Sequence, residues 1–481
     1  MAGGAAGAEG AAGTAEGAAG DADTLLRSRS YLVLLAFAVL LGVPVSAAAF
    51  GFLALVGKLE PLLYHDLPRG LGFDGTPPWW PVPLLAVGGL LTALCVRYLP
   101  GRGGHEPTDG FSAAGTPALT ALPGILLAAL ATLAFGAVLG PEAPLLALGG
   151  GLAAGSVRLL RPGLPARVYA VVGATGSFAA VSSLLGSPLL GAFLLMEAAG
   201  LGGPMLGPVL VPGLLASGIG ALIFVGIGSW TGLGTYSLKL PDVPKAADPT
   251  AAQFGWALLI GLAAALLAAA IRWLARRSRD RVEVRRLPLT VLLGLLVAGL
   301  AVAYAQGSDK PATDVLYSGQ SAMGPLLSGA AGYSVGTLFL LLACKGLAYA
   351  ASLSAFRGGP IFPSLYVGAA GGVLMSHLPG LPLVAAFATG MGAMSVAVLR
   401  LPLTSVLLAT LLIGRDGLTV MPLVILAVVV SYVATAALSR PARPQGPQAA
   451  HGPQAPPAPT APPHPEDRPP HPPGSAHPAG P

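Results

Sequence analysis

Long apolar runs, separated by short polar stretches, fill the chain from about residue 31 to residue 438. Several runs reach the ~20 residues that an α-helix needs to cross a bilayer, while others are shorter and broken by Gly and Pro. Broken helices at membrane depth are tolerated only where they pack inside protein or line a wet cavity. The pattern therefore predicts an all-α, polytopic membrane protein with broken and re-entrant half-helices. Its apolar segments lie near 31–57, 80–99, 117–138, 141–160, 167–186, 187–200, 204–228, 251–274, 287–305, 324–352, 361–377, 380–398, 401–414 and 418–438.

The composition also indicates lipid as the solvent of this chain. Of its residues 54% are hydrophobic and 10% are charged, whereas soluble domains carry about 25% charged residues. The two cysteines, Cys95 and Cys344, lie in apolar runs without metal-ligand spacing. The expected spans hold no histidine apart from His377, near a helix end, so the paired groups of a membrane-embedded enzyme are missing. We expect neither an enzyme nor a metal or cofactor site.

The distribution of charge predicts the topology. The net charge is +6, and seven arginines fall within residues 272–286. Short basic loops stay in the cytoplasm, so we interpret this stretch as a cytoplasmic loop and not as a nucleic-acid surface. Arg27 and Arg29 precede the first span and favour a cytoplasmic N-terminus. The absence of a transit-peptide pattern and of regulatory domains favours a prokaryotic-type plasma membrane. We therefore expect a multi-pass protein of the plasma membrane with both termini in the cytoplasm.

Composition divides the chain into three parts. Residues 1–29 are rich in Ala and Gly, and residues 441–481 are rich in Pro. Neither segment has the apolar residues of a packed core, so both are expected to be disordered. Residues 30–440 between them form the predicted transmembrane domain.

Each half of this domain contains one broken segment at a comparable depth. The halves cover about 30–238 and 251–440, and the broken segments are 140–144 and 358–363. A pair of Gly/Pro-interrupted segments in corresponding positions indicates a binding site between inverted repeats.

Glu142 is the sharpest candidate for function. It follows Gly140 and Pro141 between long apolar runs, and a carboxylate at bilayer depth costs about 2.5 kcal/mol or more. Proline suits the first turn of a helix, so Glu142 is predicted at a helix N-terminus, where free amides attract anions. The carboxylate would fill that anion site until protonation or a mobile anion displaced it. A helix-capping glutamate in a loop is the alternative.

Two further glycine-rich stretches are candidates for contact with a ligand. Residues 103–107 read Gly-Gly-His-Glu-Pro, and glycines let a backbone approach a ligand closely. Residues 356–363 lead into an apolar helix and would aim free amides at one point in the membrane. Taken alone, an exposed loop explains the first stretch better, and a plain helix start explains the second equally well.

Together, these stretches resemble the signature regions of the CLC chloride channel and transporter family. The family has a GSGIP-like, a GREGP-like and a GGIFAP-like stretch, and the counterparts here, in the same order, are residues 103–107, 140–144 and 359–363. Three more agreements are Pro188-Leu189-Leu190-Gly191 leading to Glu197, the basic Lys345, and Leu401-Pro402-Leu403-Thr404. The resemblance covers roughly residues 30–440. It implies a CLC-like inverted repeat, with one anion pathway in each subunit of a homodimer, in a prokaryotic-type member without regulatory domains.

Carried over residue by residue, the resemblance makes Glu142 the gating glutamate. Ile361 and Phe362 match residues whose backbone amides contact the anion, and Gly104 falls at the position of the pore serine. Glu197 is a candidate on a proton path. The anion-binding set implied by the resemblance is Gly103, Gly104, His105, Gly140, Ala143, Ile361 and Phe362.

Four positions depart from the family pattern. Gly104 has no hydroxyl, and Pro141 replaces the arginine before the gating glutamate. The tyrosine that closes the central site would fall near Arg443, in the Pro-rich tail. Ala198 stands where proton-coupled exchangers carry an inner glutamate.

These departures favour passive chloride conduction gated by Glu142. Proton coupling needs a titratable relay, which Ala198 cannot provide, and Glu197 is one position away, a rotation of about 100° around a helix. Chloride/proton antiport, through water or Glu197, is the first alternative. Secondary transport of another anion is the second. The expected partners are chloride or another small anion, the lipid bilayer and a second copy of the chain.

Overall fold

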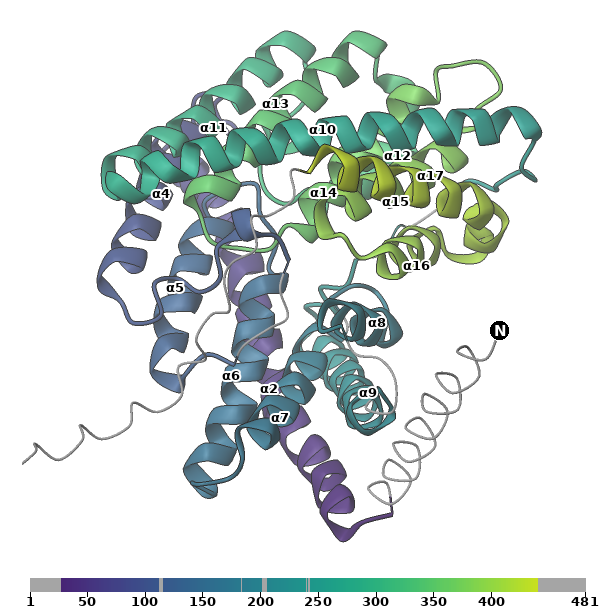
Figure 1. Ribbon diagram of the computed structural model, residues 1–481. Coiled ribbons are helices and arrows are strands. Elements are labelled where there is room, and N and C mark those ends of the chain that lie inside the picture. Colours follow the sequence, from purple (N-terminus) through teal and green to yellow (C-terminus); the bar gives the residue numbers. More distant parts are fainter. Residues whose placement is uncertain are drawn as a thin grey trace, which may run out of the picture. The chain divides into compact units, whose positions relative to one another are not determined.

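A computed structural model describes residues 27–111, 116–182, 184–200, 206–238, 240 and 243–439 (Figure 1). Within these residues, eight helices are long and apolar enough to cross a membrane, which confirms the predicted all-α membrane fold. Arg443, most of residues 1–29 and all of 441–481 lie outside the described part. The first half contains α2 (Arg29–Pro61), η1 (Leu62–Asp66), α3 (Leu67–Gly70), α4 (Pro81–Tyr98), η2 (Pro107–Asp109), η3 (Leu119–Ala121), α5 (Leu122–Leu133), α6 (Glu142–Leu160), α7 (Ala166–Val181), α8 (Pro188–Ala198) and α9 (Leu206–Thr231).

The long helix α10 runs across the second half and contacts most of the other α-helices there (Figure 1). Its elements are α10 (Ala251–Val284), α11 (Arg286–Ser308), η5 (Ala312–Asp314), α12 (Met323–Ser328), η6 (Ala330–Gly332), α13 (Val335–Ala355), α14 (Ile361–Met375), α15 (Leu383–Leu399), α16 (Pro402–Ile413), η7 (Gly414–Asp416) and α17 (Gly417–Leu438). Among the expected short helices, α8 has 11 residues and α14 has 15, too few for a full span.

Two expectations about helix boundaries were wrong. The basic stretch 272–286 is not a loop, because α10 continues as a helix to Val284 and α11 starts at Arg286. Arginine is a good helix former, and Arg279 pairs with Glu283 one turn later at 3.1 Å. The single apolar segment expected at 324–352 is divided into α12 and α13.

Close glycine contacts fix the helix that follows each broken segment. On α6, a Cβ added at Gly149 would overlap the carbonyl oxygen of Gly176 on α7, and the reverse also holds. On α14, Gly368 stands in the same relation to Gly390 on α15. Small residues let membrane helices approach to backbone contact. In each half, the same kind of packing therefore fixes the helix that follows the broken segment.

Candidate functional site

The two broken segments meet in a short antiparallel bridge. The Gly140 amide donates to the Gly359 carbonyl at 2.8 Å, and the Gly359 amide donates to the Gly140 carbonyl at 2.7 Å. A proline follows each glycine, and α6 and α14 begin at the next residue. Both segments read Gly-Pro-X-X-Pro, and the bridge aligns them so that Ile361 occupies the place of Glu142 in the other half. The positive ends of two helix dipoles therefore converge on one point.

The Glu142 side chain fills that point. Its carboxylate is fully buried, and Oε1 accepts a hydrogen bond from the Ile361 amide at the start of α14. The Phe362 amide is a further donor toward the same carboxylate. Both bridge glycines are needed for space, because a Cβ at Gly140 would overlap Oε2 and one at Gly359 would overlap Cγ and Cδ of Glu142. The carboxylate thus sits in a cradle of backbone amides at a helix start, a kind of donor set that favours negative charge.

Buried polar side chains hold the irregular backbone around this cradle. The Val138 amide donates to the Ser352 hydroxyl at 3.0 Å. On the other side, the Tyr349 hydroxyl donates to the Pro360 carbonyl at 2.9 Å. Backbone groups left open by a broken helix need such partners inside a membrane protein. The sequence interpretation missed Ser352 and Tyr349; small polar residues and a tyrosine within the α13 span were the available signal.

Two cavities approach the cradle from different sides. One, of about 470 Å³, is lined by Ala143 together with Gly103, Gly104 and His105. The other, of about 380 Å³, includes Leu139, Pro141, Glu60 and Tyr317 in its lining. Residues just before and just after Glu142 belong to different cavities, so its carboxylate lies in the wall between them.

The stretch 103–107 turns its backbone at two glycines that line the 470 Å³ cavity. Gly103 and Gly104 have φ angles of +73° and +82°, the left-handed region that glycine adopts readily. A Cβ at Gly103 would come within 2.9 Å of the Arg357 side chain. One at Gly104 would approach Ile125 at 3.2 Å. The His105 ring contacts the Gly110 carbonyl at 2.9 Å. The structure thus places all three predicted residues at one cavity, away from the Glu142 carboxylate itself.

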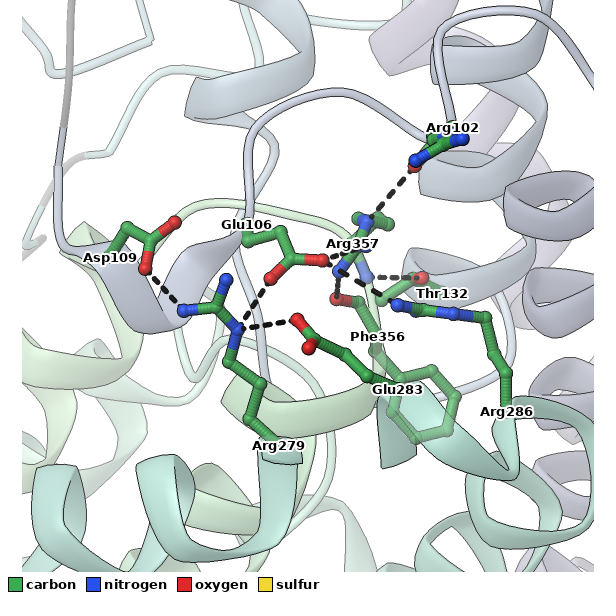
Figure 2. Close-up of polar contacts among 9 residues, drawn as sticks. All are labelled: Arg102, Glu106, Asp109, Thr132, Arg279, Glu283, Arg286, Phe356 and Arg357. Carbon is green, nitrogen blue, oxygen red and sulfur yellow. Dashed lines mark hydrogen bonds and ion pairs between the residues drawn. The ribbon is translucent and has the colours of Figure 1, made fainter. Parts of the chain in front are cut away.

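A cluster of ion pairs surrounds Glu106 beside this cavity (Figure 2). The Glu106 carboxylate contacts Arg357 at 2.8 Å, Arg279 at 2.6 Å and Arg286 at 3.6 Å. Burial raises the pKa of Glu106, but the neighbouring Arg357 and Arg279 guanidinium groups lower it more, so its pKa lies below the ordinary value. Sequence reasoning gave Glu106 and Arg357 no role, since nothing local signals that residues 251 positions apart form a pair.

Glu197, on α8, points its carboxylate at the start of α16. Its carboxylate accepts the amides of Leu403 and Thr404 at 2.9 and 2.7 Å, and the Thr404 hydroxyl at 2.6 Å. It therefore caps α16 from α8. The structure does not bring Glu197 together with Glu142.

The fold and site define a class of protein. Two helices from opposite halves of a membrane domain point their N-terminal amides at one buried carboxylate, which lies in the wall between two cavities. This arrangement is that of a membrane transport protein for small anions.

Comparisons with known proteins agree with this class. The model of the voltage gated chloride channel family matches residues 88–436. Among curated proteins, the putative ion-transport proteins YfeO of Salmonella schwarzengrund and Salmonella typhimurium are 28% identical over 373 residues, which cover 74% of this chain and 84% of each relative. The family match extends over most of the chain, so the protein belongs to the voltage-gated chloride channel family, CLC.

Solved structures share the fold. A slow cyanobacterial Cl⁻/H⁺ antiporter superposes with a TM-score of 0.66 at 18% identity, covering 84% of this chain and 94% of that one. A CLC-type fluoride/proton antiporter gives 0.60 at 18%, with 84% and 96% covered. A eukaryotic CLC transporter gives 0.62 at 19%, with 86% and 73% covered.

Proposed function

We propose that the protein carries chloride across the plasma membrane through a pathway in each subunit, gated by Glu142, as a channel-like passive conductor. The observation that supports this is the buried Glu142 carboxylate in the wall between two cavities, bound to the Ile361 amide. An anion passing from one cavity to the other has to replace the carboxylate at these amides. Protonation weakens the hold of the amides on the carboxylate and so opens the gate.

The anion site extends along the two Gly-Pro segments. Gly140 supplies the space for the carboxylate, and the Ile361 and Phe362 amides are its donors. Ala143 belongs to the lining of the larger of the two cavities, together with Gly103, Gly104 and His105. This set carries only backbone donors and one imidazole ring, which suits a small, weakly selected anion.

Passive conduction is favoured over exchange because a proton relay is missing on the α8 side. Ala198 cannot carry a proton, and the Glu197 carboxylate is engaged by α16. Chloride/proton antiport is the second candidate, supported by the fold shared with two proton-coupled antiporters. Transport of another anion is the third.

Assembly and orientation complete the proposal. We infer a homodimer from the family resemblance, with α10 ending in the cytoplasm because arginines crowd its last turns. Both termini would then lie in the cytoplasm.

Paired flux measurements separate the candidates. Purified protein in chloride-loaded liposomes, with valinomycin present, is assayed for chloride efflux and external pH together. Passive conduction predicts efflux without coupled proton movement, whereas proton uptake in fixed ratio to chloride would establish antiport. Absence of chloride efflux, with efflux of another anion, would overturn the chloride assignment.

A further inference from the structure

Arg357 stands between two cavities on the pathway side that contains Gly104. It lines the 470 Å³ cavity that reaches Ala143, and also a second cavity of about 980 Å³. The larger cavity is lined by four arginines and two glutamates, namely Arg97, Arg102, Arg286, Arg357, Glu106 and Glu283. This excess of positive charge attracts anions into the cavity. An anion moving from there toward Glu142 has Arg357 beside it at the boundary.

The Arg357 guanidinium is buried but not saturated with partners. Its side chain is 4% exposed. Within the described residues, Nε donates to the Arg102 carbonyl at 3.5 Å, Nη1 to the Phe356 carbonyl at 3.3 Å and Nη2 to Glu106 at 2.8 Å. A guanidinium has five N–H donors in a planar fork, so two remain for a ligand. The missing side chain of Gly103 gives the arginine its room.

The Glu106 carboxylate binds the Arg357 guanidinium in the way that a mobile anion would bind it. Its carboxylate is held by Arg279 and Arg286 from the α10–α11 corner, so it is tethered beside the guanidinium but belongs to a different segment of the chain (Figure 2). This arrangement parallels the cradle, where the Glu142 carboxylate accepts a hydrogen bond from the Ile361 amide. In both places a side-chain carboxylate fills a donor site that lies on the route between cavities.

We propose that Arg357 is a second anion-binding residue of the pathway and that Glu106 is its tethered competitor, which chloride displaces in part when it binds. The proposal rests on the anion transport proposed above. It also offers a side-chain contact for the anion in a chain where the pore serine is replaced by Gly104.

Chloride binding to purified protein tests this directly. Chloride is titrated calorimetrically into wild-type protein in chloride-free buffer, and Glu142 is left intact so that its carboxylate fills the cradle. Arg357→Gln should weaken chloride binding about tenfold or more, because a hydrogen bond to a charged group is lost. Glu106→Gln should tighten binding, because the competitor loses its charge. Arg277→Gln is the matched control, since it removes an exposed arginine from the same end of α10, outside both cavities, and should change binding little.

A double variant separates binding from structure. Removing one partner of a buried ion pair destabilises a protein, whereas removing both relieves this. If Arg357 has only a structural role, Arg357→Gln combined with Glu106→Gln would restore wild-type chloride binding along with thermal stability. Our proposal predicts that stability recovers and chloride binding stays weak. Wild-type affinity in the double variant, or in Arg357→Gln alone, would overturn it.

Efflux measurements distinguish this failure from failure of the proposed function. A wild-type protein that moves chloride while Arg357→Gln binds it normally would refute only the role of Arg357. A folded wild-type protein that neither moves nor binds chloride would refute both.

Discussion

A methyl group at Gly359 should drive the Glu142 carboxylate out of its cradle. The added Cβ would overlap Cγ and Cδ of Glu142. The φ angle of Gly359 is not positive, so the backbone itself accepts an alanine. Displacement forfeits the hydrogen bond from the Ile361 amide, and a hydrogen bond to a charged group is worth about 1.5–3 kcal/mol. That free energy corresponds to a shift of about 10- to 100-fold in the occupancy of the cradle.

The assay is chloride efflux from liposomes at neutral pH. We expect Gly359→Ala to raise efflux toward the level of Glu142→Ala. Combining the two substitutions should add little, because both remove the same contact. Gly371→Ala is the matched control: it adds the same methyl group to α14, with nothing within 4 Å of the new Cβ. Wild-type efflux from Gly359→Ala, alongside an open Glu142→Ala, would refute the claim that the cradle holds the gate closed.

Three further predictions concern the supports of the site. Tyr349→Phe removes one of two donors to the buried Pro360 carbonyl, which keeps the Ser364 amide at 3.3 Å. It should lower the free energy of unfolding by about 0.5–1.5 kcal/mol, measured by thermal unfolding in detergent against the exposed control Tyr432→Phe. Glu197→Gln weakens the α16 cap and should cost about 0.5–2 kcal/mol without altering proton movement during chloride efflux; a changed proton signal would instead make Glu197 part of a relay. The lowered pKa of Glu106 contributes stability above the pKa of the unfolded chain, and this is lost as pH falls through the lower folded value. The melting temperature of wild type should therefore fall more steeply in acid than that of Glu106→Gln, and parallel curves would contradict this.

Hydrophobic pattern was sufficient to predict the membrane fold but not where α10 ends. Apolar runs identify buried or lipid-facing segments directly, because lipid replaces water as the solvent. The arginine-rich stretch 272–286 is polar, so the pattern ended the helix too early, although arginine favours helix and Arg279 pairs with Glu283 within it. Polarity reports the solvent around a residue and is a poorer guide to its backbone conformation.

The site was predictable where its chemistry is local. Glu142 after Gly-Pro signals a charged group at a helix start, and this needs no knowledge of the other half. The Gly140–Gly359 bridge joins segments that are more than 200 positions apart in the chain. Tyr349 and the Pro360 carbonyl that it contacts are 11 positions apart. Both contacts follow only from the packing of the folded chain. The pair of Glu106 and Arg357 was missed for the same reason, since each residue alone looks like a solvated charge in a loop.

We propose that the Glu142 carboxylate closes an anion pathway and that its protonation opens it. The most direct test is chloride efflux measured across a series of external pH values for wild type and Glu142→Ala in the same liposome preparation. Wild-type efflux should rise as pH falls, while Glu142→Ala should conduct at a higher and pH-independent rate. A folded Glu142→Ala protein that is silent, or that keeps the wild-type response to pH, would contradict it.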